Sequence, residues 1–126
     1  GGRNVKDSFG ICRLCTPSLA LTLEIINAVT GWSWDVEAAK EMGLRIVNLM
    51  RMFNFRHGLK KEMEAPSVRY SSTPTDGPAA GIGIREHWDA IRDNYYAEMG
   101  WDIETGRPLP ETLEKYGLTD LVERYS

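Results

Sequence analysis

The longest regular feature of the chain is a run of apolar side chains at helical spacing in its first half. Its members recur every three or four residues on one face: Val36, Ala39, Met42 or Gly43, Ile46, Leu49 or Met50, and Phe53. This period matches the 3.6-residue turn of an α-helix rather than the two-residue alternation of a strand. The pattern predicts a long helix that is capped by Ser33 and runs toward His57 and Gly58.

Shorter helices are predicted on either side of this one. Apolar residues recur at helical spacing from Leu19 to Val29, with Thr16 as N-cap, Pro17 at the first helical position and Gly31 as the stop. A third helix has its apolar face at Trp88, Ile91, Tyr95 and Met99, and Gly100 closes it.

The end of the chain carries signals for one more short helix. Pro108 or Pro110 can open it, and Leu113 and Tyr116 lie on it. Gly117 is the expected left-handed stop, with Leu118 as the apolar contact that accompanies such a stop. Thr119 is expected to cap a last turn to Tyr125.

A long connection separates the second and third helices. Residues 60–83 are rich in helix-breaking residues: Pro66, Pro74, Gly77, Pro78, Gly81 and Gly83. Such a segment is expected to be extended and to lie over a surface of the domain. The fold class that follows is all-α: a single irregular helical domain over residues 1–126, with about four helices and a long Pro/Gly-rich connection.

Composition limits the classes of function. An apolar content of 42% and a charged content of 26% are typical of a folded globular domain. The net charge of -3 provides no basic surface for nucleic acid. The most apolar stretch, Leu19 to Val29, contains Glu24 and is too short to cross a bilayer. Two cysteines make a poor disulfide framework, and no secretory leader is recognisable, so we expect a cytoplasmic protein.

The residue types best suited to a cofactor lie near the start of the chain. Asp7, Gly10, Cys12 and Cys15 place a carboxylate, a glycine turn and two thiols in what is expected to be one short loop. An iron-sulfur or zinc site needs about four ligands, which two thiols do not supply. Either the other ligands come from elsewhere, or the thiols are small, partly buried apolar groups.

Several short motifs follow one another in a characteristic order. They are Asp7-x-x-Gly10-Ile11-Cys12, then Thr30-Gly31-Trp32, then Gly43-x-Arg45-Ile46-x-Asn48-Leu49-x-Arg51-x-Phe53-Asn54-x-Arg56-x-Gly58, then Tyr95-Tyr96-x-x-x-Gly100-Trp101-Asp102, and Leu113-x-x-Tyr116-Gly117-Leu118. In this order and spacing they resemble the C-terminal region of the tungsten-dependent aldehyde ferredoxin oxidoreductase family. The resemblance covers nearly the whole chain.

The resemblance implies a cofactor and roles for four residues. Enzymes of this family hold tungsten, or occasionally molybdenum, between two pterins beside a 4Fe-4S cluster. Cys12 matches the fourth cluster ligand, and Asp7 matches an aspartate that hydrogen-bonds a pterin amine. Gly10 lets the backbone approach the cofactor, and Ile11 replaces the usual leucine. Cys15 has no role in the family motif and is expected to be a packing residue.

The resemblance also implies that this chain works as part of a larger enzyme. The family's upstream cluster cysteines, its N-terminal β-rich domain and the acid/base residues closest to the metal have no counterpart in this sequence, so the central helical domain and the β-rich domain are expected to be partners within the same enzyme. The implied reaction oxidises an aldehyde with water to a carboxylic acid and passes two electrons to ferredoxin. Three alternatives stay open: a related low-potential reductase subunit that reduces an aromatic thioester ring, a cofactor-free helical interaction module, and a small metal or redox domain using Cys12 and Cys15.

Overall fold

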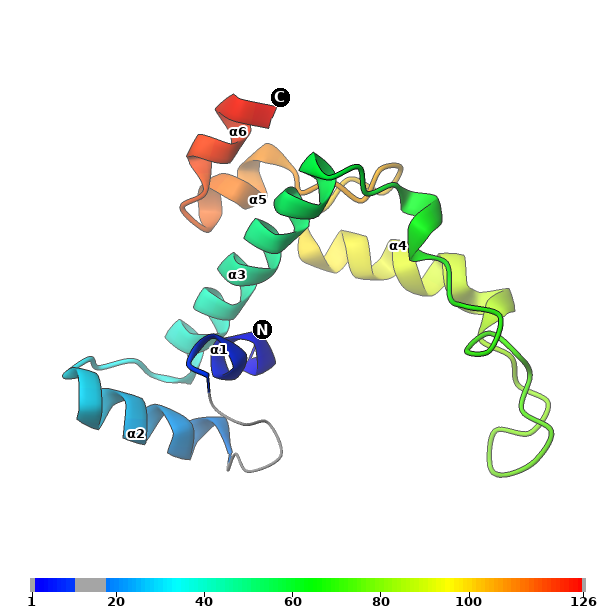
Figure 1. Ribbon diagram of the computed structural model, residues 1–126, viewed down its shortest axis with the longest axis horizontal. Helices are drawn as coiled ribbons and strands as arrows, with labels where there is room; N and C mark the ends of the chain where they lie inside the picture. The colour runs from blue at the N-terminus through cyan, green and yellow to red at the C-terminus, as the bar shows by residue number, and fades with distance from the viewer. Residues whose placement is uncertain (1, 11–17, 126) are drawn as a thin grey trace.

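The computed structural model describes the backbone of residues 2–10 and 18–125 (Figure 1). Over these residues the chain forms six α-helices and two 3-10 helices: α1 (Gly2–Ser8), α2 (Leu19–Thr30), α3 (Val36–Arg56), η1 (Lys61–Glu64), η2 (Arg85–His87), α4 (Trp88–Met99), α5 (Pro110–Lys115) and α6 (Thr119–Tyr125). The extended pairing found within these ranges is one isolated antiparallel bridge between Trp101 and Pro108. The predicted all-α class is therefore confirmed.

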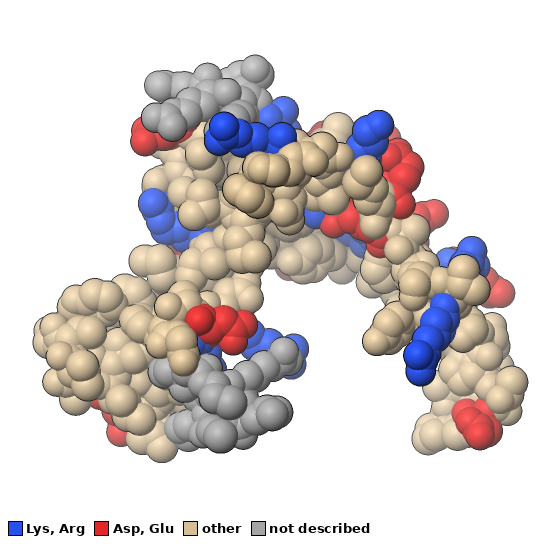
Figure 2. All heavy atoms as spheres, in the orientation of Figure 1, with Lys and Arg blue, Asp and Glu red and all other residues tan. Residues whose placement is uncertain are grey.

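The helices form an open arch rather than a sphere (Figure 1). Helix α3 is its long diagonal, with α1 and α2 at the N-terminal end of that helix and α5 and α6 at the other. Helix α4 leads away from the C-terminal end of α3 and makes the second limb. In Figure 2 the two limbs are separated by open space, and acidic and basic side chains are interspersed over the visible face.

Helix α2 starts and stops for clear local reasons. The Ser18 hydroxyl accepts a hydrogen bond from the Leu21 amide at 3.3 Å, which makes Ser18 the N-cap. The prediction of Thr16 as the N-cap is wrong; Thr16 and Pro17 themselves lie outside the described residues. At the other end Gly31 has φ +75°, and this left-handed C-cap confirms the predicted stop.

Helix α3 has the predicted length but a different cap. Asp35, not Ser33, is the N-cap, and its carboxylate accepts from the Ala38 amide at 2.8 Å. A carboxylate at this position also interacts favourably with the positive end of the helix dipole. The helix ends at Arg56 with His57 as its C-cap, as predicted.

The buried face of α3 changes along its length. In the first half Ala39 is buried as expected, but in the second half Asn48, Arg51 and Met52 are the buried residues. Leu49, Met50 and Phe53 lie outside the core, with 47%, 58% and 58% of their surface exposed. The predicted apolar face is therefore wrong for this half, because the turn after α4 packs on the polar residues instead.

The C-terminal helices follow the predicted stops. Gly100 and Gly117 both have left-handed backbone, with φ +66° and φ +64°. Pro110 is the first residue of α5, and the Leu118 amide donates to the Leu113 carbonyl at 2.8 Å, as expected for a glycine-stopped helix. Thr119 is the first residue of α6 rather than its cap.

The connection between α3 and α4 is surface-exposed, as expected, but doubles back on itself. Its first part packs on the helices, where η1 brings Glu64 to α3. Its second part forms an arm beyond α4 (Figure 1), held where the Arg85 guanidinium donates to the Ser71 hydroxyl at 2.7 Å. The expectation that the whole segment lies over a surface is therefore correct only for its first part.

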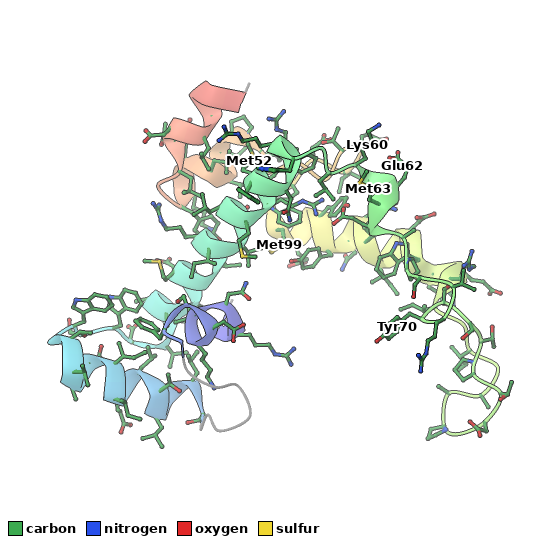
Figure 3. The ribbon with its side chains drawn as sticks, viewed as in Figure 1. Met52, Lys60, Glu62, Met63, Tyr70 and Met99 are labelled. Atoms are coloured by element: carbon green, nitrogen blue, oxygen red, sulfur yellow. The ribbon has the colours of Figure 1, made fainter. Side chains whose placement is uncertain are left out.

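Two small apolar clusters hold the ends of α3. Val5, Leu23 and Ala39 join α1, α2 and the start of α3. Met52, Leu113 and Leu118 join the end of α3 to α5 and α6; Met52 is labelled in Figure 3. A third joint, between α3, η1 and the residues after α4, is polar and is described below.

Candidate functional site

The predicted cofactor motif lies at the end of α1. Asp7 occupies the last turn of this helix and is exposed, so the expectation that it belongs to a loop is wrong. Gly10 follows with φ +67°, and its amide donates to the Asp7 carbonyl at 3.1 Å. Ile11 and Cys12, and Cys15 after them, lie outside the described residues.

Aromatic packing fixes where this helix end points. Phe9 contacts Trp34 edge-to-face with ring centroids 6.2 Å apart, and Trp32 stacks on Trp34 at 4.8 Å. Val5, on the same helix, is fully buried between α2 and α3. Asp7 and Gly10 therefore adjoin side chains that pack α1 against α2 and α3.

The chemistry of these two residues suits a pterin. An ionised carboxylate is purely an acceptor, and a pterin offers N–H donors along one edge. A Cβ placed on Gly10 would meet no atom of the described residues within 4 Å, so none of these residues blocks the approach of a ligand to that stretch of backbone. The chemistry of Asp7 and Gly10 is thus compatible with the pterin that the resemblance implies. Among the described residues, no cluster of three or more His, Cys, Asp or Glu side chains could hold a metal ion.

A second cluster, which we call the Arg51 network, consists of Arg51, Glu64, Tyr96, Gly106 and Trp101. The Arg51 guanidinium binds the Glu64 carboxylate through both terminal nitrogens, and the Nη2–Oε2 distance is 2.8 Å. Its Nε donates to the Gly106 carbonyl at 2.9 Å, and Nη2 also donates to the Tyr96 hydroxyl at 3.2 Å. The Tyr96 hydroxyl in turn donates to Glu64.

Aromatic rings complete the surroundings of Arg51. Its guanidinium carbon lies 4.4 Å from the centroid of the Trp101 ring and 5.2 Å from that of Tyr96, both within cation–π range. The Trp101 indole N–H donates to the Asn48 side-chain oxygen at 2.8 Å, which explains the buried asparagine on α3. The side chain of Arg51 is 8% exposed, so the charge is nearly desolvated.

The protonation states inside the network are fixed by its partners. The hydrogen bond from Arg51 holds the pKa of Glu64 below its ordinary value, against the opposing effect of burial. Burial, followed by the hydrogen bond to the Glu64 carboxylate, raises the pKa of Tyr96. Glu64 is thus kept ionised and Tyr96 neutral at physiological pH.

The network is a structural joint rather than a catalytic centre. Arg51 directs four hydrogen bonds to protein groups, which uses most of the five donors of a guanidinium. Such a saturated group has little capacity left for a substrate. The sequence motifs contained Arg51, Tyr96 and Trp101, but their pairing joins segments up to 55 residues apart and has no local signature.

Comparison with known proteins gives a consistent match. Residues 2–118 match the family model described as aldehyde ferredoxin oxidoreductase, domains 2 and 3. A tungsten-containing aldehyde ferredoxin oxidoreductase of Pyrococcus abyssi is 31% identical over 120 residues, covering 92% of this chain and 19% of that protein. The protein of the same name from Pyrococcus furiosus is 30% identical over 118 residues, covering 90% of this chain and 19% of its own length.

The aligned region is nearly all of this chain but only a small part of each relative. The chain spans about a fifth of the length of these relatives, while nearly all of the chain is matched. No solved structure matches it.

Proposed function

Because the chain belongs to the aldehyde ferredoxin oxidoreductase family, we propose that it is the C-terminal helical domain of a tungsten-dependent enzyme that oxidises aldehydes to carboxylic acids. The observation that carries this proposal is the match over residues 2–118, which contains the Asp7-to-Cys12 motif at the end of α1. In this proposal residues 1–126 act as one domain that completes the cofactor site of a larger polypeptide.

The proposed roles of the site residues follow from their chemistry. Asp7 accepts a hydrogen bond from the pterin, and Gly10 and Ile11 bring backbone close to the cofactor. Cys12 supplies a thiolate, the soft ligand that iron clusters require, to a 4Fe-4S cluster. When bound, the tungsten bis-pterin, or a molybdenum counterpart, supplies the two-electron oxidation, and the cluster carries the electrons away. This chain's own residues bind and orient these groups.

The proposed partners are the rest of the same enzyme and ferredoxin. The rest comprises the N-terminal β-rich domain and the central helical domain, which supply the other cluster ligands. Alone, the chain is expected to be inactive because it spans a fifth of its relatives' length. We place the enzyme in the cytoplasm, where iron-sulfur clusters and free thiols persist. No helix in the described part of the chain is long and apolar enough to cross a membrane.

A chimeric enzyme tests the proposal directly. In the Pyrococcus furiosus relative, the 118 matched residues are replaced by the corresponding residues of this chain. Purified without oxygen, this chimera is expected to contain tungsten and about four iron atoms per polypeptide, and to reduce ferredoxin when an aldehyde is added. The unaltered relative is the control for cofactor loading. A folded chimera that lacks tungsten and iron, beside a loaded control, would contradict the proposal.

A further inference from the structure

Helix α4 borders a hollow that no residue of the proposed cofactor site shares. The hollow has a volume of about 450 Å³ and is lined by Glu64, Trp88, Ile91, Arg92, Tyr95 and Tyr96. Ile91 and Tyr95 are each 48% exposed, although both lie on the face that the sequence pattern predicts to be buried. We call this feature the α4 hollow.

One residue that lines the α4 hollow, Trp88, carries an unsatisfied polar group. Its indole N–H is buried and has no hydrogen-bond partner within the described part of the chain. A donor shielded from water and left without an acceptor is destabilising. Tryptophan N–H groups usually find a partner when they are buried.

Two large apolar side chains of the connecting arm are exposed as well. Val68 and Tyr70 are 81% and 83% exposed. Figure 3 shows the Tyr70 side chain projecting from the arm into the space beneath α4. Large apolar side chains gathered around a concave surface mark an interaction site rather than ordinary solvent-facing surface.

The lengths of the relatives indicate the occupant. In a polypeptide of family length, about four-fifths of the residues lie outside the region that this chain matches. These residues are on the same polypeptide, so their effective concentration at the α4 hollow exceeds that of any free partner. We propose that an apolar segment from the part of a family-length polypeptide outside this chain packs into the α4 hollow. This inference rests on the proposed function, in which the chain works inside a larger enzyme.

Footprinting with hydroxyl radicals and mass spectrometry tests the proposal on the isolated chain and on the chimera, both prepared without cofactor. Modification of Ile91 and Tyr95 is expected to fall by roughly fivefold in the chimera, as half-exposed side chains become part of a buried interface. Unchanged modification would overturn the inference. The footprinting needs no bound metal. If the hollow is protected in a chimera that cannot load tungsten, the proposed function is contradicted while this inference stands.

A pair of matched substitutions locates the contact. Ile91→Asp and Val29→Asp both replace exposed side chains, 48% and 81% exposed, on two different helices. Each should leave the Tm of the isolated chain nearly unchanged, whereas Ile91→Asp alone should lower the Tm of the chimera. Equal losses of Tm in the two chimera variants would show that the contact surface is not specific to α4.

If the chimera is insoluble, this chain is co-expressed with the Pyrococcus furiosus protein from which the matched residues were deleted. Ile91→Asp, but not Val29→Asp, should then abolish co-purification, and failure of the unaltered pair to associate would overturn the inference.

Two further outcomes would assign the hollow to another occupant. Sedimentation of the isolated chain as a tight dimer that Ile91→Asp dissociates would assign the surface to a second copy. A stoichiometric small molecule found by native mass spectrometry, and lost in Tyr95→Ala, would assign it to a ligand. Either result would overturn the inference, which expects a monomer without ligand.

Discussion

Asp7 is exposed at the C-terminal end of α1, where a negative charge gains nothing from the helix dipole. Asp7 is therefore expected to contribute to cofactor binding rather than to the stability of the fold. Asp7→Asn should change the free energy of unfolding of the isolated chain by no more than about 0.5 kcal/mol. Thermal denaturation measures this.

Asp35 provides the control for that substitution. It is an exposed aspartate as well, but it caps α3 through the Ala38 amide. Asp35→Ala should cost about 1 kcal/mol because a helix N-cap is lost. A loss at Asp7 as large as that at Asp35 would make Asp7 a structural residue.

Arg51 is expected to be among the most sensitive residues of the chain. Arg51→Met should destabilise the fold by roughly 3–5 kcal/mol, because Glu64 would be left partly buried without its partner. Arg51→Lys should not restore stability, since an ammonium cannot bind the carboxylate through two nitrogens or stack as the guanidinium does. Urea denaturation measures both.

The exposed pair Lys40–Glu37 is the matched control for Arg51. Its side chains are 52% and 76% exposed, and they lie 2.7 Å apart. Lys40→Met should cost less than about 1 kcal/mol. Similar losses at Lys40 and Arg51 would show that burial of the Arg51 network contributes little.

Glu64 should make the stability of the chain depend on pH in the acid range. Its pKa in the folded state is lowered from the ordinary value of 4.5, mainly by the hydrogen bond from Arg51. A lowered pKa means that this contribution is fully present above pH 4.5 and is lost as the pH falls through the folded-state pKa. Urea denaturation between about pH 3 and pH 6 should therefore show a smaller fall in stability for Glu64→Gln than for the natural chain. Parallel curves for the two proteins would contradict this assignment.

The turn between α4 and α5 depends on Gly106. This residue has φ +74°, and a Cβ placed on it would overlap the Arg51 guanidinium and the Tyr96 ring. Gly106→Ala should therefore cost about 2–5 kcal/mol, from the left-handed backbone and from overpacking together. Gly58 has φ +87° with nothing within 4 Å of its would-be Cβ, so Gly58→Ala should cost only the backbone share. Equal Tm losses for the two variants would show that a methyl group at position 106 does not disturb the Arg51 network.

Helix ends were predictable from the sequence where a single residue dictates them. Gly31, Gly100 and Gly117 each stop a helix in the left-handed conformation that glycine adopts most readily. Helix starts were less predictable, because Ser, Thr and Asp all cap well and several lie close together before α2 and α3. Helix α1 was not predicted because its 7 residues are too few to show a period.

The buried faces of α3 and α4 could not be read from periodicity. Asn48, Arg51 and Tyr96 are buried because their polar groups find hydrogen-bond partners in distant segments. Arg51 donates to the Tyr96 hydroxyl, and Asn48 accepts from the Trp101 indole N–H. A pattern that counts apolar residues assigns the core to Leu49, Phe53 and Ile91, which the structure leaves exposed. The motifs of the resemblance did contain the network residues, but a motif gives order along the chain and no contacts.

At the scale of the whole molecule, the candidate motif adjoins one of the three joints, because Val5 belongs to the first apolar cluster and Phe9 packs against it. Two small apolar clusters and the Arg51 network hold the arch together, while the motif that begins at Asp7 lies at the end of α1. Exposed apolar side chains lie on both limbs of the arch, among them Val29 on α2 and Ile91 on α4. In the proposed function such surfaces face the rest of a larger enzyme. We therefore assign folding to the joints and propose cofactor binding for the Asp7-to-Cys12 motif.

The most direct test of that assignment compares the two cysteines in the cofactor-loaded chimera. Electron paramagnetic resonance with redox titration reports on the 4Fe-4S cluster of Cys12→Ser and Cys15→Ser proteins. If Cys12 is the fourth ligand, Cys12→Ser should change the spectrum and the reduction potential or lose the cluster, because a hydroxyl is a poorer ligand for iron than a thiolate. Cys15→Ser should leave both unchanged. Equal effects of the two substitutions, or an unaltered cluster in Cys12→Ser, would contradict the account.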